Sequence, residues 1–322
     1  ETVYMLDVPN ANEEGLETAL FLMNETAREL TFTPEAVDRE REIIISERRV
    51  RDTPGLRDFR DLFEFRIPGT LYNTRFPIGL DAVIREAPAE RLRALYNRFY
   101  RPENTTLIAV GDFDVAEMEA AIREKFSDWK PRGEAGIMPQ PGSIDFNRET
   151  EFDVYVDPNL NSGVAIYQLR PYTDPADTRA ERTKIQLRNL ASIIFNRRIS
   201  RIANREDSPI LGGGYGTGSD DGVADYTVVN MTTRDGAWEE GLKIAEQEVR
   251  RALQYGFTQN ELEYALTQVE SSLRRGVAQE DARTNGQLAS DLVNVATENY
   301  FVTDPEWRYE FFQSIRPQLT VD

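Results

Sequence analysis

A loop rich in proline and glycine divides the 322-residue chain and restricts it to folds built from two parts. Three prolines and three glycines lie between Pro131 and Gly142, where neither a helix nor a strand continues easily. The expected order of elements, strands followed by long helices, begins again after this loop. Because the chain is also long for a single core, we expect two consecutive similar domains, residues 1–135 and 151–322, joined by a linker over 136–150.

The hydrophobic pattern predicts the elements of each part. Apolar residues at helical spacing, with capping and breaking residues at the ends, predict helices at about 13–30, 35–51, 56–65, 88–100, 115–126, 177–203, 238–255, 259–275, 281–298 and 305–314. Alternation and short apolar runs predict strands at 2–8, 104–111, 151–156, 162–169 and 222–232, with a glycine-rich strand at 210–218. Hairpin-like groups of strands and separate runs of helices indicate an α+β fold.

Composition excludes several classes of function. The formal net charge is −18, and such a surface repels phosphate backbones, so we expect no nucleic-acid partner. No apolar run approaches the roughly 20 residues that a membrane helix needs, so we expect a soluble protein that does not cross a membrane. The chain has no histidine and no cysteine. It therefore contains no Ser-His-Asp triad, no histidine metal ligand and no disulfide.

The expected helix over 35–51 carries two carboxylates on its apolar side. Glu40 and Glu47 are seven residues apart and so lie almost on one line of a helix. The same face holds Val37, Ile43, Ile44 and Val50. Buried carboxylates need a cation. One explanation is salt bridges to the neighbouring arginines; the other is that Glu47 binds a metal ion and Glu40 braces the site.

Four segments carry a family resemblance. Residues 39–47 resemble the second zinc-site helix of the pitrilysin/insulinase-like zinc metallopeptidases, peptidase family M16. Three further segments look like hallmarks of that family, in its order and at similar spacing: Arg75–Gly79, Phe99–Asn104 and Val110–Asp114. The resemblance is sharp to about residue 130 and looser to the end.

The resemblance implies a LuxS-like metallopeptidase fold, with a mainly antiparallel sheet and helices on one face in each domain. It implies that Glu47 is the third zinc ligand and that Glu40 lies near the site and orients a histidine. The family's His-x-x-Glu-His helix, which supplies two ligands and the general base, is not in this chain. We therefore expect residues before Glu1, a first domain incomplete at its N-terminus and a second that may be incomplete at its C-terminus. We expect zinc in the full-length protein, and neither zinc nor catalysis by this chain alone.

The glycine-rich segment Gly212, Gly213, Gly214 and Tyr215 is a second candidate site. In the resembled family a comparable edge strand anchors a bound peptide by strand addition; a twisted, bulged edge explains the glycines equally. Three functions stay open: part of an active zinc metalloendopeptidase, a non-catalytic scaffold that closes the chamber of a partner half, or a peptide-binding module. The first is favoured, with peptides or unfolded segments as substrates, the remaining M16 domains as partners and a bacterial periplasmic location.

Overall fold

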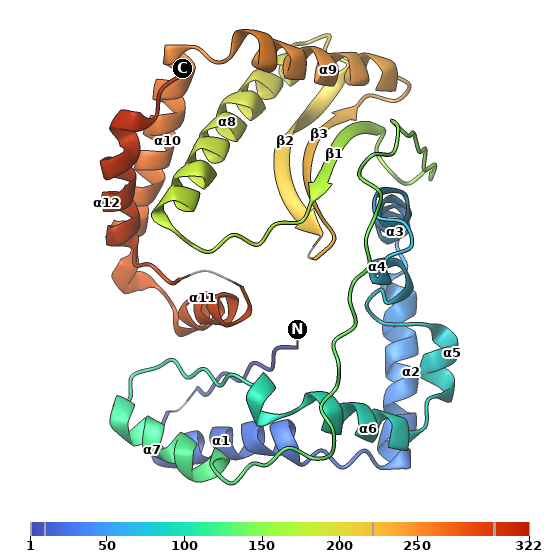
Figure 1. Ribbon diagram of the computed structural model, residues 1–322, viewed down its shortest axis with the longest axis vertical. Helices are drawn as coiled ribbons and strands as arrows, with labels where there is room; N and C mark the ends of the chain where they lie inside the picture. The colour runs from blue at the N-terminus through green and yellow to red at the C-terminus, as the bar shows by residue number, and fades with distance from the viewer. Residues whose placement is uncertain (1, 10, 221, 299–300, 322) are drawn as a thin grey trace. The chain divides into compact units, whose positions relative to one another are not determined.

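The computed structural model describes residues 2–9, 11–220, 222–298 and 301–321. Its α-helices are α1 (Glu13–Arg28), α2 (Pro34–Arg51), α3 (Pro54–Arg66), α4 (Leu71–Thr74), α5 (Asp81–Glu86), α6 (Ala89–Phe99), α7 (Val115–Phe126), α8 (Arg179–Ala203), α9 (Trp238–Tyr255), α10 (Gln259–Ala278), α11 (Asn285–Thr297) and α12 (Pro305–Ile315) (Figure 1). Its strands are β1 (Gly163–Pro171), β2 (Ile210–Asp220) and β3 (Ala224–Thr233). The α+β class is confirmed. None of the described helices is long and apolar enough to cross a membrane.

The chain forms two compact units, each assembled from separate segments. The first combines residues 1–51, 75–139 and 283–298, and the second combines 52–74, 140–282 and 299–322. Helix α3 therefore packs with the second unit, although it precedes the loop that the sequence marks as a divider. The boundary at residues 136–150 stays a prediction.

The second unit contains an antiparallel sheet in the order β1-β3-β2. Tyr167 pairs with Val228 across one ladder, and Tyr215 pairs with Val229 across the other. The register shifts between Ile210 and Gly212, which is a β-bulge. Strand β2 is an edge of the sheet in the described chain, as the sequence predicts, and it carries the expected bulge.

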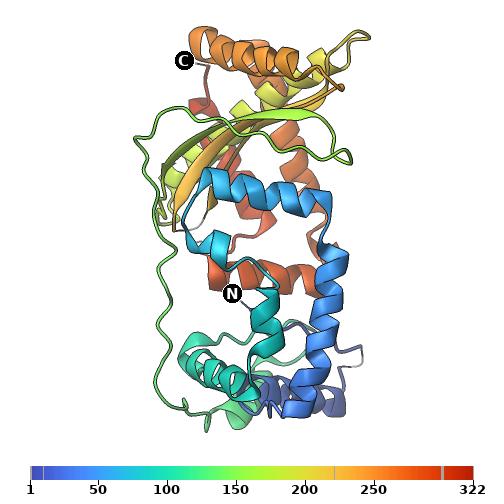
Figure 2. The same cartoon turned by 90° about the vertical axis from the view of Figure 1, so that its right-hand side faces the viewer.

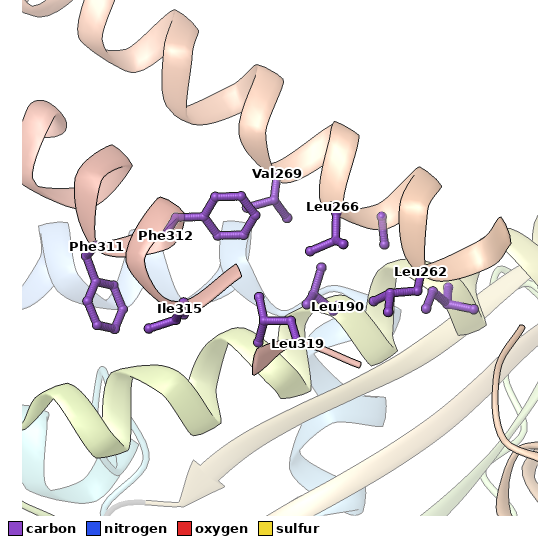
Figure 3. Close-up of a cluster of buried hydrophobic side chains, with 10 residues drawn as sticks. Leu190, Leu262, Leu266, Val269, Phe311, Phe312, Ile315 and Leu319 are labelled. Atoms are coloured by element: carbon purple, nitrogen blue, oxygen red, sulfur yellow. The ribbon is translucent and has the colours of Figure 1, made fainter. Parts of the chain in front are cut away.

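Helices α8 and α9 cover one face of this sheet. Val229 and Met231 of β3 pack against Phe195 of α8 and Ala245 of α9 in one buried cluster. A second cluster joins α8 to α10, α12 and the turn after it, and its labelled members point toward one another in Figure 3: Leu190, Leu262, Leu266, Val269, Phe311, Phe312, Ile315 and Leu319. Burial of these apolar side chains stabilises the unit, at about 1.5–3 kcal/mol for each large residue.

Helix α3 lies on the opposite face of the sheet, so that the strands run between α9 and α3 (Figure 2). Its Arg66 donates to both carboxylate oxygens of Asp220, from Nε at 2.9 Å and from Nη2 at 2.5 Å. The two side chains are only 5% and 3% exposed. The guanidinium also faces the rings of Phe63, Tyr167 and Tyr226 at 4.3–5.3 Å. This ion pair, enclosed by aromatic rings, fixes α3 against the sheet.

Polar contacts hold the helices of the first unit. The buried Asn24 of α1 donates to the carbonyl of Lys125 at the end of α7, at 2.6 Å. Arg101, which is 8% exposed, pairs with Glu103 at 2.5 Å and donates to the carbonyl of Gly133 at 3.1 Å. This gives the segment around residues 99–104 a structural role.

The predicted helices are confirmed to within four residues at either end, and α4 and α5 are additional short helices. The strands predicted at 2–8, 104–111 and 151–156 are wrong: these segments form no ladder. A strand needs a hydrogen-bonded neighbour, and an apolar run alone does not provide one. In consequence the described residues of the first unit form no sheet of their own.

Candidate zinc-ligand helix and peptide edge

Residues at the start of helix α2 and contacts of its inward side explain where the helix begins and how it is oriented in its unit. Pro34 occupies its first turn, and the Thr33 hydroxyl accepts from the Ala36 N–H at 3.3 Å. The inward side of the helix carries Ile45, which is 3% exposed. The Arg41 guanidinium on that side donates to the backbone carbonyls at the end of α5 and just beyond it, those of residues 84 and 87. These contacts fix which side of α2 faces away from its unit.

The outward side of α2 carries both candidate acids. The side chains of Glu40 and Glu47 are 55% and 44% exposed. Ile43 and Val50 on the same face are 55% and 78% exposed. The apolar stripe that the sequence predicts is therefore present, but it lies at the surface of the described chain. An exposed apolar stripe marks a surface that another element can cover.

Each acid has an arginine neighbour on its own helix. Glu47 pairs with Arg51 at 2.5 Å, and Glu40 pairs with Arg39 at 3.4 Å. Arg51 and Arg39 are 61% and 70% exposed. Such exposed pairs contribute only about 0–1 kcal/mol, so they do not explain why acids stand in an apolar face.

The described chain does not assemble a complete zinc site. Across those residues, no three side chains of histidine, cysteine, aspartate or glutamate come together in a group that could hold a metal. Glu40 and Glu47 are separated by about 10.5 Å along the helix axis, from the rise of 1.5 Å per residue. Zinc sites use three or four protein ligands. The roles predicted for Glu47 and Glu40 therefore stay predictions.

Close packing explains two of the three glycines at the candidate peptide edge. A Cβ at Gly213 would lie 2.2 Å from the carbonyl oxygen of Asn230 in β3, so the backbones approach too closely for a side chain. A Cβ at Gly214 would lie 2.7 Å from Oδ1 of Asn196, which comes from α8. Gly212, by contrast, has nothing within 4 Å of its Cβ position.

Asn196 occupies the edge of β2 at Tyr215. Its Oδ1 accepts from the Tyr215 N–H at 2.7 Å, and its Nδ2 donates to the Tyr215 carbonyl at 3.4 Å. The side-chain amide thus takes the two backbone groups that an added strand would use there. No signal in the sequence identifies Asn196, because its partner lies 19 residues away in another element.

A comparison with known families identifies the family of the chain. The sequence profile of the peptidase M16 inactive domain matches residues 87–269, which is more than half of the chain. The chain belongs to the peptidase M16 family. The match starts after α2, so the two candidate acids lie outside the matched segment.

Two further comparisons cover nearly the whole chain. The probable zinc protease PqqL of Escherichia coli is 27% identical over 326 residues, which covers 100% of this chain and 34% of PqqL. This M16 chain thus spans about a third of that relative's length. The crystal structure of the first half of the periplasmic protease PqqL from Escherichia coli aligns with a TM-score of 0.82 at 23% identity, over 97% of this chain and 67% of that one.

Another structural neighbour is a mutant of the ferredoxin protease FusC in complex with Arabidopsis ferredoxin. It aligns with a TM-score of 0.73 at 16% identity, over 97% of this chain and 35% of that one. At these identities the structural likeness establishes the shared fold.

Proposed function

We propose that this chain is part of a zinc-dependent metalloendopeptidase that hydrolyses peptides or unfolded segments. Glu47 is the third zinc ligand in this proposal, Glu40 supports the site, and the His-x-x-Glu-His helix comes from another part of the full-length protein. The observation that carries the proposal is the outward face of α2. Exposed Ile43 and Val50 flank two carboxylates that lack a strong partner.

Covering that face explains why the acids are there. An element packed on Ile43 and Val50 removes apolar surface from water, at about 25 cal/mol per Å². The same packing desolvates Glu47, which is costly for an ionised carboxylate unless a cation is present. A zinc ion held jointly by Glu47 and the covering element resolves this conflict.

Peptide binding is assigned in the same proposal to the edge of β2 at Gly212, Gly213, Gly214 and Tyr215. An extended peptide adds to an exposed edge through backbone hydrogen bonds. Because Asn196 occupies the Tyr215 position, the added strand has to displace that side chain or stop beside it.

A non-catalytic scaffold is the second candidate. It is favoured by the matched profile, which is that of an inactive M16 domain. In this alternative the outward face of α2 serves only to bind a partner half and close its chamber.

Metal content and peptidase activity of the full-length protein distinguish the two candidates. The enzyme proposal predicts about one zinc per molecule that survives dialysis, hydrolysis of an unfolded peptide, and loss of hydrolysis after chelation that zinc restores. Full-length protein that folds but holds no zinc and cleaves no peptide would support the scaffold instead.

The cellular location is also a proposal. We infer a bacterial periplasmic protein, since the structurally similar PqqL is described as a periplasmic protease. Fractionation of cells that express the full-length protein tests this, and recovery with cytoplasmic markers alone would contradict it.

A further inference from the structure

A cavity of about 1040 Å³ lies within the second unit, between the C-terminal half of α8, the turn after it, and the adjoining parts of α9 and α10. We call it the arginine pocket, after the side chains that line it: Arg197, Arg198, Arg201, Arg205 and Arg251. Its volume is at the upper end of those that hold small molecules, which run from about 300 to 1,000 Å³.

The charge of the arginine pocket is opposite to that of the chain. Its five arginines face three acids, Asp207, Glu248 and Glu261, so its lining carries a net charge of 5 − 3 = +2. The whole chain carries −18. A positive hollow in an acidic protein concentrates anions locally.

Three of the five arginines lack an acidic partner. Arg198 pairs with Glu261 at 2.6 Å, and Arg251 pairs with Glu248 at 3.4 Å. In the part of the chain that the structure describes, no carboxylate lies within 4.0 Å of the guanidinium of Arg197, Arg201 or Arg205. The Arg197 guanidinium lies over the Tyr264 ring instead.

Helical spacing places these charges side by side. Arg197 and Arg201 are four residues apart on α8, and Arg205 follows four residues later in the turn. Like charges at this spacing destabilise a helix by about 0.2–0.5 kcal/mol per pair. The negative end of the helix dipole offsets this for Arg201, which is in the last turn of α8, but Arg197 lies more than a turn earlier.

Two buried polar atoms in the lining have no hydrogen-bond partner in the structure. They are Nη1 of Arg198, a donor, and Oε2 of Glu248, an acceptor. The side chain of Glu248 is only 5% exposed. Buried polar groups are normally paired, so each such atom calls for a partner. Arg198 and Glu248 are therefore lining residues with unused hydrogen-bonding capacity, one as a donor and one as an acceptor.

We propose that the arginine pocket binds a small polyvalent phosphate ester that also carries hydroxyl or amino groups. The phosphate oxygens accept from Arg198, Arg201 and Arg205, because the planar guanidinium matches phosphate geometry with paired bonds. A hydroxyl or amino group of the ligand donates to Glu248. This proposal does not depend on the role of Glu47, since no residue of α2 lines the pocket.

Calorimetric titration of the full-length protein at constant ionic strength tests the proposal with three probes: ADP, inorganic pyrophosphate and citrate. ADP and pyrophosphate both contain a diphosphate group, but only ADP also carries the hydroxyl and amino donors of a nucleoside. We expect ADP to bind at least tenfold more tightly than pyrophosphate, and both to bind more tightly than citrate. Equal affinity for citrate and ADP would show a non-selective basic surface and overturn the proposal, as would no binding of ADP.

Three variants locate the site. Arg201→Gln with Arg205→Gln should weaken ADP binding at least tenfold, whereas Arg250→Gln, an exposed arginine of α9 that pairs with Glu246 outside the pocket, should leave it unchanged. Glu248→Gln should strengthen pyrophosphate binding and reduce the preference for ADP over pyrophosphate. Unchanged ADP affinity in the double arginine variant would place the binding elsewhere and refute the assignment. Melting curves of each variant confirm that it folds.

Discussion

Replacing Arg66 by methionine should destabilise the second unit more than any substitution of an exposed arginine. The change keeps an unbranched apolar stem and removes the guanidinium, with both its charge and its hydrogen-bond donors. It leaves the Asp220 carboxylate, 3% exposed, without the guanidinium that donates to both its oxygens at 2.9 and 2.5 Å. The three aromatic rings that face the guanidinium do not compensate, because a ring face attracts a cation and not an anion.

The magnitude follows from the burial of the pair. Breaking a buried ion pair by removing one partner costs about 3–5 kcal/mol. We expect about 4 kcal/mol, since Arg66 also loses its contacts with Phe63, Tyr167 and Tyr226. With a urea slope of about 2 kcal/mol per molar, the unfolding midpoint should fall by about 2 M.

Urea unfolding followed by circular dichroism measures this, with Arg57→Met as the matched control. Arg57 is on the same helix, is 41% exposed and pairs with Asp157 at 3.2 Å, so its loss should cost less than about 1 kcal/mol. Adding Asp220→Asn to Arg66→Met removes the buried negative charge and should restore most of the loss. A midpoint for Arg66→Met that equals that of Arg57→Met would refute the role given to this pair.

Two further predictions concern the sheet edge and pH. Gly214→Ala should destabilise the fold by about 1–3 kcal/mol, because its Cβ would lie 2.7 Å from Asn196. Gly216→Ala is the control: its Cβ would meet only Val228 at 3.8 Å, so its melting temperature should be nearly that of the parent. The hydrogen bond from Arg198 is the largest cause that lowers the pKa of Glu261 from 4.5 to about 2. This carboxylate therefore adds about 3 kcal/mol of stability above pH 4.5, which is lost as the pH falls towards 2. Glutamine at position 261 can still form the capping box. The urea midpoint of Glu261→Gln should therefore equal that of the parent at pH 2 and be lower at pH 7. The same difference in midpoint at both pH values would contradict this.

How far the sequence predicted the structure depends on the range of the interactions. Helices such as α7 and α9 were predicted with their observed bounds, because periodicity and caps act within a few residues. The capping box of Thr258 and Glu261, which begins α10, is likewise a contact between residues three apart. The segment at 104–111 has an apolar run typical of a strand, yet pairing requires a distant neighbour that the run does not specify.

The candidate sites show the same limit. The sequence placed Glu40 and Glu47 on one face of α2, which is a property of the helix alone. It did not predict that this face is exposed, because exposure depends on what packs against it. The Arg66 and Asp220 pair joins residues 154 positions apart, and no local pattern announces such a contact.

Zinc titration of the full-length Glu47→Gln protein tests the central claim most directly, with Glu42→Gln, an exposed acid on another side of α2, as the control. The proposal predicts that zinc affinity collapses in Glu47→Gln and is unchanged in Glu42→Gln. It also predicts that Glu40→Gln weakens zinc binding about 10- to 100-fold, as for other acids that orient a ligand. Stability measured without zinc should change little or rise in Glu47→Gln, since a carboxylate in a covered apolar face is costly without its cation. Full zinc affinity in Glu47→Gln would contradict the account.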